Sequence, residues 1–168
     1  MPISRRGGAE ITRVQDLFSI GKVNTALKTS VGGQYTTDVL PPSEKFFLGG
    51  TRFGRGFYYG QVTGDRAIGS SLELQFNTQL SDLPLVNADY QVPLQFYSFW
   101  DYGHSYNVPK SNDPDRTIQS LGLGVRSDLT RWLFVELEGV RRLTTHPQGA
   151  AVSAENDYAV FTRLTLHY

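Results

Sequence analysis

Residue types that support catalysis are scarce and poorly spaced in this sequence. The three histidines, His104, His146 and His167, fall on different predicted elements, and none occurs in the His-x-x-x-His or His-Glu-x-x-His spacing of a metal site. The chain has no cysteine, which excludes disulfides, thiolate metal sites and cysteine nucleophiles. We therefore expect no metal, no other cofactor and no enzymatic activity.

Two glutamates are the best remaining candidates for acid–base chemistry. Glu136 and Glu138 lie two residues apart in a predicted strand and so share a face, as the carboxylate pair of a retaining glycosidase could. The same spacing occurs in the solvated or ion-paired wall of a barrel. We favour the wall, which is the more common setting for such a pair.

Arg55 is a candidate of a different kind, because it lies between two glycines in the segment Phe53-Gly54-Arg55-Gly56-Phe57. Flanking glycines let the backbone turn tightly and present one long side chain. A guanidinium in a protein interior needs a carboxylate, since an unpaired buried charge is costly. The alternative is a solvated arginine on a glycine-rich surface turn. The surrounding elements decide between the two.

Those elements are β-strands, because period-2 alternation of apolar and polar residues recurs while helical periodicity is almost absent. We expect most strands to be about 10–13 residues long, beyond the usual soluble strand and sufficient for a tilted strand that spans a membrane. A weaker strand precedes six clear ones. The predicted strands are centred on residues 10–22, 27–35, 71–77, 94–101, 121–126, 133–138 and 158–168.

The connections and composition agree with a barrel in lipid. Short or moderate turns are predicted at Val23-Asn24, 81–89 and 128–131, and longer polar loops at 107–116 and 144–156. Short turns at one end and long loops at the other are typical of outer-membrane barrels. The formal net charge of zero argues against a nucleic-acid partner. The sequence predicts an all-β, antiparallel transmembrane β-barrel portion of about seven long strands.

One connection, between the second and third strands, is too long for a hairpin turn. It runs from Asp38 to Arg66 and contains six glycines and several aromatic residues. A solvated linker would avoid such aromatics, and loops of this length are usually functional. We expect this loop to fold inward and to pack against the inside of the barrel.

Strand alternation also assigns a side to the charges. When the apolar residues of each strand face lipid, one set of charged residues falls on the lumen side, because successive side chains alternate between faces. Glu73 and Asp101 belong to this set and lie on the two strands after the long loop, so we hypothesise that Arg55 pairs with them and holds the loop in place. The whole set is Glu73, Asp101, Arg126, Glu136, Glu138 and Arg163.

The long loop and the next strands resemble the loop-six region of two-partner-secretion transporters, the haemolysin secretion/activation family, which is related to the barrel-assembly insertases. The opening of the family pattern is matched by Leu40, Pro41, Glu44, Phe46, Leu48, Gly49 and Gly50, and its centre by Arg55, Gly56 and Phe57. Its end is matched by Gly64, Asp65, Arg66, Glu73 and Leu74, and the Phe-x-Asp-x-Gly strand motif by Phe99, Asp101 and Gly103. The C-terminal assembly signal corresponds to Leu164, Leu166 and Tyr168, in the segment from Val160.

The resemblance implies a role for these residues. In the family, the loop arginine reaches into the barrel and meets the aspartate of the strand motif, which implies pairing of Arg55 with Asp101 and with Glu73. One departure is Gly54, which stands where the family usually has valine, and we expect it to loosen the loop. The resemblance also implies that residues 1–168 are the C-terminal part of a transporter barrel, with a loop-six-like segment at 38–66.

The leading functional interpretation is a pore that translocates a haemolysin- or adhesin-like exoprotein across the outer membrane. The implied partners are that exoprotein, membrane lipid, and the N-terminal barrel and POTRA portions of the family. The residues 1–8 carry no recognisable signal peptide, so we expect a fragment of a longer product and an outer-membrane location only within it. A barrel-assembly insertase and a small soluble β binding module remain alternatives.

Overall fold

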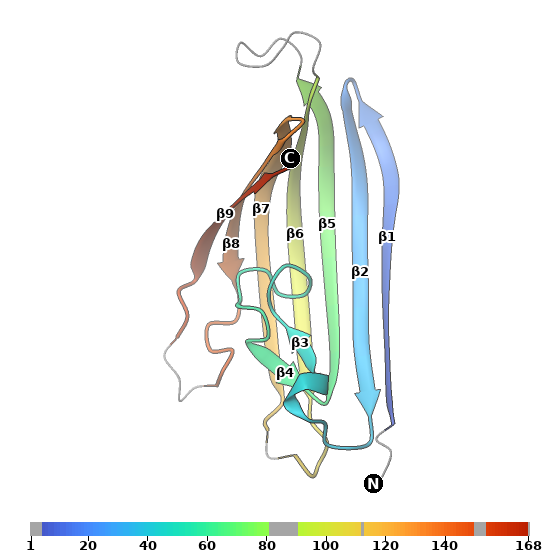
Figure 1. Ribbon diagram of the computed structural model, residues 1–168, viewed down its shortest axis with the longest axis vertical. Helices are drawn as coiled ribbons and strands as arrows, with labels where there is room; N and C mark the ends of the chain where they lie inside the picture. Colours follow the sequence, from blue (N-terminus) through green and yellow to red (C-terminus); the bar gives the residue numbers. More distant parts are fainter. Residues whose placement is uncertain (1–4, 81–90, 112, 150–153, 168) are drawn as a thin grey trace.

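The computed structural model describes residues 5–80, 91–111, 113–149 and 154–167, and almost all of its regular structure is β (Figure 1). The prediction of an all-β fold with seven long antiparallel strands is confirmed. No helix in the described ranges is long and apolar enough to cross a membrane. The long strands are β1 (Arg6–Ile20), β2 (Val23–Thr36), β5 (Arg66–Leu80), β6 (Val92–Tyr106), β7 (Arg116–Thr130), β8 (Leu133–Arg142) and β9 (Tyr158–Leu166).

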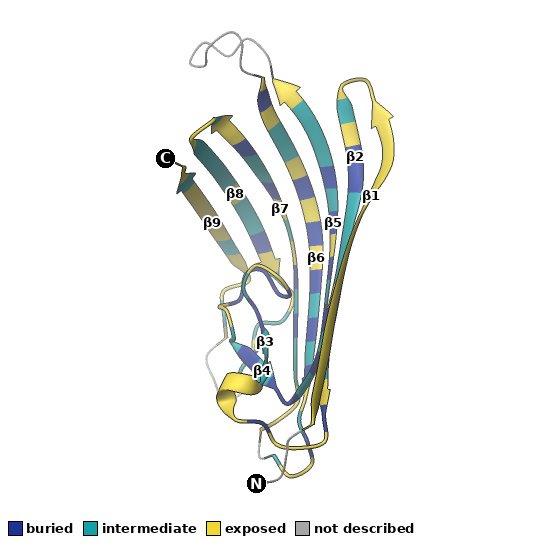
Figure 2. Ribbon diagram, turned by 45° about the vertical axis from the view of Figure 1, so that its right-hand side comes forward, coloured by how far each residue is buried: buried dark blue, intermediate teal, exposed yellow. Residues whose placement is uncertain are grey.

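These strands form one curved sheet in the order β1-β2-β5-β6-β7-β8-β9, and every neighbouring pair is antiparallel. Strands of up to 15 residues fit a membrane-spanning wall better than a soluble sandwich. Strand β1 and strand β9 are the two edges, and Figure 2 shows the sheet curving around a concave side. The architecture is that of part of a β-barrel.

The two faces of the sheet differ in chemistry as the alternation predicts. On β5, Leu72 is 40% exposed whereas its neighbour Glu73 is 4% exposed. The predicted lumen charges do share the concave face, because ion pairs link them across β5, β7, β8 and β9. The opposite, convex face presents apolar side chains that include Phe96, Trp100, Leu123 and Leu164.

Two turns lie slightly away from their predicted places. The first connection is Gly21-Lys22 rather than Val23-Asn24, because Gly21 takes a φ of 59° and Val23 already pairs with Ile20. Strand β7 continues to Thr130 past a register shift, so the next turn is 131–132 rather than 128–131. The third predicted turn, 81–89, lies outside the described residues.

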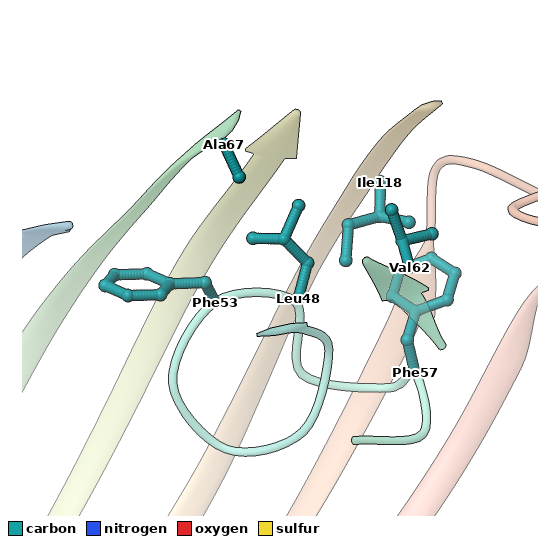
Figure 3. Packing of buried hydrophobic residues seen from close by; sticks show 6 residues of the cluster. All are labelled: Leu48, Phe53, Phe57, Val62, Ala67 and Ile118. Atoms are coloured by element: carbon teal, nitrogen blue, oxygen red, sulfur yellow. The ribbon is translucent and has the colours of Figure 1, made fainter. Parts of the chain in front are cut away.

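The segment between β2 and β5, residues 37–65, folds against the concave face, and we call it the inner loop (Figures 1 and 2). It contains a 3-10 turn, η1 (Pro42–Glu44), and a small antiparallel pair, β3 (Phe46–Leu48) and β4 (Val62–Gly64). Apolar side chains from the loop and from the sheet meet in one buried cluster, which anchors the loop by hydrophobic burial (Figure 3). Its members are Leu48, Phe53, Phe57, Val62, Ala67 and Ile118.

Candidate functional site

The tip of the inner loop is built to present Arg55 to the sheet. Gly54 and Gly56 have φ values of 108° and 92°, in the region that favours glycine. The backbone reverses around Arg55, and a hydrogen bond from the Phe57 N–H to the Gly54 carbonyl at 3.2 Å closes the turn. The aromatic residues on either side, Phe53 and Phe57, enter the buried cluster. The guanidinium therefore projects from a turn that is fixed on both flanks.

Asp101 of β6 is the principal partner of Arg55. The guanidinium Nε donates to Oδ2 at 3.0 Å, and Nη2 donates to Oδ1 at 3.0 Å. The backbone N–H groups of Gly54 and Arg55 also donate to Oδ2, at 3.3 and 2.9 Å. One carboxylate thus binds both the side chain and the backbone of the loop tip, in the two-pronged geometry that gives arginine–carboxylate pairs their strength.

Glu73 of β5 completes the charge balance on the other side of the guanidinium. Arg55 Nη1 donates to Glu73 Oε2 at 2.5 Å, and Nη2 donates to the Ser71 hydroxyl at 3.0 Å. The Ser71 hydroxyl donates in turn to Asp101 Oδ1 at 2.7 Å. Burial lowers the pKa of Arg55, but the hydrogen bonds and charges of Asp101 and Glu73 outweigh it and raise that pKa above its ordinary value. The arginine stays charged throughout the accessible pH range.

The Phe-x-Asp-x-Gly motif places three functional positions on the same face of β6. Phe99 lies under the guanidinium, with Arg55 Cζ 3.5 Å from its ring centroid, a cation–π arrangement. Asp101 binds the guanidinium, and Gly103 leaves room for the loop residue Leu48, which a Cβ there would meet at 2.9 Å. Side chains at every second residue of a strand share a face, so Phe99, Asp101 and Gly103 all face the inner loop.

Gly54 tightens the site, contrary to the expectation that it loosens the loop. A Cβ at this position would overlap Ile118, and the positive φ would strain any other residue. The backbone N–H of Gly54 donates to Asp101 Oδ2 at 3.3 Å. Gly56 is equally constrained, because a Cβ would lie 2.7 Å from Val140, and its carbonyl accepts a 2.6 Å hydrogen bond from Arg142 Nε.

The motif residues at the start of the loop tip shape its backbone. Gly49 and Gly50 have φ values of 97° and 78°. The Gly49 N–H donates to the Phe53 carbonyl at 2.8 Å, and the Gly50 N–H donates to the Phe57 carbonyl at 2.9 Å. These glycines close the loop tip on itself.

The motif Gly64-Asp65-Arg66 fastens the end of the loop. Asp65 is fully buried, and its carboxylate accepts hydrogen bonds from the backbone N–H groups of Leu40, at 2.9 Å, and Val108, at 3.4 Å. Gly64 approaches Ser105 of β6, where a Cβ would have no room. Arg66 Nε donates to the Thr36 carbonyl at 2.7 Å. Both ends of the loop are thereby tied to each other and to the sheet.

A second group of charges extends from Glu73 across the concave wall. Arg126 Nη2 donates to Glu73 Oε1 at 2.9 Å, and Arg163 pairs with Glu136 at 3.1 Å. The Tyr97 hydroxyl lies 2.9 Å from both Glu136 and Glu138. The two glutamates that could have formed an acid–base pair are thus engaged in the ion-paired wall.

The predicted C-terminal assembly residues lie on the edge strand. Leu164 and Leu166 are 67% and 66% exposed on β9. Tyr168, the last residue of that signal, lies outside the described residues. The exposed pair is available to lipid or to a neighbouring protein, and the structure brings neither leucine to the Arg55 site.

Sequence reasoning missed several residues that shape the site. Ser71 bridges Arg55 and Asp101, and its only signal was its place two residues before Glu73 on the same face. Glycines inside strands also matter: a Cβ at Gly69 would overlap Phe53, and one at Gly122 would overlap Phe99. Isolated glycines in a strand pattern signal such close approaches.

Comparison with known proteins identifies the family. The Omp85 superfamily domain matches residues 8–132, which include most of β1, all of β2 to β7 and the whole inner loop. Superfamily members are outer-membrane proteins that translocate or insert other proteins. No curated protein and no solved structure matches the chain. The match covers well over half of the sequence and contains the Arg55 site, so the chain belongs to the Omp85 superfamily.

Proposed function

We propose that this chain forms the C-terminal part of a pore that secretes an exoprotein across the outer membrane, in the manner of two-partner secretion. The observation that carries the proposal is the bond from Arg55, on the inner loop, to Glu73 and Asp101 on a polar concave face. An unfolded polypeptide would pass along that face. The inner loop would hold the pore in a competent state, and substrate binding would bias the opening.

Features at the two ends of the inner loop favour secretion over insertion. The opening Pro41-Pro42-Ser43-Glu44, which follows Leu40, and the closing Gly64-Asp65-Arg66 resemble the secretion family. They also meet in space, since the Leu40 N–H donates to Asp65 Oδ1 at 2.9 Å. This contact joins the two ends of the inner loop.

The proposed partners follow from the surfaces. Lipid would cover the convex face, where Trp100 and Leu123 are exposed. Further barrel strands would pair with β1 and β9, because each unpaired backbone group at a strand edge in lipid costs several kcal/mol. POTRA domains and an exported haemolysin or adhesin complete the set, as in the secretion family.

Deletion of the gene for this chain tests the proposal. Proteins released into the medium and barrel proteins of the outer membrane are quantified by mass spectrometry, with wild-type and Arg55→Ala complementation. Secretion predicts loss of one or a few large proteins from the medium, unchanged barrel proteins, and rescue by the wild-type gene alone. Insertion, which superfamily membership makes the second candidate, predicts a fall in many barrel proteins. Unchanged medium and membrane would contradict both.

A further inference from the structure

The concave face has a hollow beside the Gly21-Lys22 turn. This turn, between β1 and β2, lies at the end of the sheet away from the inner loop (Figure 1). Its volume is about 630 Å³, and it is lined mainly by β2, β5, β6 and β7. Side-chain amides form much of its polar lining. We call the surface formed by Asn24, Asn77, Gln79, Gln91 and Gln95 the amide shelf.

The chemistry of the amide shelf matches a polypeptide main chain. A side-chain amide offers an N–H donor and a carbonyl acceptor, the same pair of groups that a peptide unit offers. On β5, Asn77 and Gln79 lie two residues apart on the concave face, in line with Gln75, which is buried and donates to Glu73. Their repeat of about 6.7 Å equals the spacing of alternate peptide units in an extended chain. An extended segment lying along β5 could therefore meet one amide per two residues.

The shelf is held in place from one side and open on the other. Gln95 donates to the side-chain carbonyl of Asn77 and accepts from Arg126, which Glu73 binds at 2.9 Å. Within the described residues, the side-chain amides of Gln79 and Gln91 form no hydrogen bond. The network thus orients Asn77 and Gln95, and it leaves the amides of Gln79 and Gln91 without a partner among the described residues.

The charged residues around the amide shelf do not favour a ligand of either charge. The ionisable residues in its lining are Lys22, Arg126 and Asp128. Arg126 is engaged by Glu73 and lies 3.9 Å from Glu136. The Arg55 site differs, because its carboxylates bind one particular cation. A surface without such a preference fits a ligand of variable sequence.

From this juxtaposition we propose that the amide shelf binds an extended polypeptide through its main-chain groups, with little regard to side-chain charge. The proposal rests on the proposed translocation function and adds the place where the moving chain is held. Side-chain recognition would need pockets or charges aimed at particular groups. The shelf instead repeats the donor and acceptor pattern of a backbone.

Site-directed photocrosslinking tests the shelf, since the chain has no cysteine and a single introduced thiol is unique. An Asn77→Cys variant in detergent is labelled with a benzophenone and mixed with unstructured peptides of glycine, serine and threonine. One peptide is neutral, one carries aspartates and one carries lysines. The control is Ser98→Cys, on β6 but on the exposed convex face.

The expected result is crosslinking of all three peptides to the Asn77→Cys variant, with yields within about threefold of one another. The Ser98→Cys control should give at least tenfold less, roughly a 1.4 kcal/mol difference. Equal yields at the two positions, no yield at Asn77→Cys, or yield with only one charged peptide would overturn the proposal. Circular dichroism checks that both variants keep their strands.

An isosteric change gives a second readout. Asn77→Asp keeps the shape of the side chain and replaces its amide nitrogen by an anionic oxygen. In the protein without the benzophenone label, the affinity for the lysine peptide should rise severalfold relative to the other two peptides. Unchanged selectivity would contradict the shelf. If the peptides crosslink as expected but deletion of the gene leaves secretion unchanged, the amide shelf is supported and the proposed function is wrong. If deletion abolishes secretion but the peptides do not crosslink, the proposed function stands and the proposal of the amide shelf is overturned.

Discussion

Arg55 and Asp101 join the inner loop to β6 through two parallel hydrogen bonds, Nε to Oδ2 and Nη2 to Oδ1, each 3.0 Å long. Both side chains are almost fully buried, at 9% and 0% exposure. Glu73 shares the same guanidinium from β5. Removing any one of the three charges leaves a buried charge without its full set of partners, which is the basis of the first two predictions.

Arg55→Ala should release the tip of the inner loop while the long strands remain. Two buried carboxylates would lose their common cation, and breaking a buried pair in this way costs about 3–5 kcal/mol. Chymotrypsin cleavage after Phe53 and Phe57, which are buried in the native loop, should accelerate strongly. Arg52→Ala is the matched control, because the Arg52 side chain is 65% exposed and its ion pair with Glu10 is worth at most about 1 kcal/mol. Equal protection of the two variants would contradict the account.

Asp101→Asn should produce a milder form of the same defect. The amide keeps the size of the carboxylate but cannot accept at both atoms, so one amide N–H₂ must face an N–H donor of Arg55 or of the loop backbone. Losing hydrogen bonds to a charged acceptor predicts a loss of about 1.5–3 kcal/mol in loop protection. The same protease assay measures it, and Asp113→Asn on an exposed side chain serves as control. Protection equal to wild type would refute this assignment.

Gly54→Val, which introduces the residue usual at this place in the secretion pattern that the loop resembles, should weaken the loop here. The φ of 108° strains any residue with a Cβ by about 1–3 kcal/mol, and the added atoms would collide with Ile118. Gly7→Val is the control, since a Cβ at Gly7 meets nothing within 4 Å. Unfolding in urea, followed by loop cleavage, should show a lower midpoint for the Gly54 variant alone. A midpoint at or above wild type would restore the interpretation that glycine loosens the loop.

Nitroxide labels should separate the two faces of the sheet. A label at Leu123, which is 70% exposed on the convex face, should collide mainly with oxygen dissolved in lipid. A label at Asn77 on the concave face should collide mainly with a water-soluble nickel chelate. Power saturation of the electron paramagnetic resonance signal in lipid vesicles measures both. The reverse ranking would show that the sheet is turned the other way in the membrane.

Most of the fold could be predicted because strand alternation is a local signal with a physical cause on each face. Leu72 and Glu73 differ in exposure as their pattern requires, and a shift of one residue would put Glu73 in lipid. Turn positions depend on more than this local pattern. The conformation of Gly21 and the register shift near Asp128 depend on the pairing of neighbouring strands, which no single segment encodes.

The site was predictable in its charges but not in its packing. Arg55, Glu73 and Asp101 could be paired from strand facing and from the resemblance. The role of Gly54 required the position of Ile118, which lies 64 residues away in the chain, and that of Ser71 required the Arg55 geometry. The sequence signals a close approach between distant segments only by the glycines and small residues at the points of contact.

Arg55 and Asp101 hold the inner loop as a coupled pair, and a double-mutant cycle measures this coupling. Loop protection from chymotrypsin is measured for wild type, Arg55→Ala, Asp101→Ala and the double variant. The double variant should lose much less protection than the sum of the single losses, with a coupling free energy of roughly 2–3 kcal/mol, at the upper end of the range for contacting residues. Losses that add within about 0.5 kcal/mol would show that the two residues act independently, which would contradict their coupling.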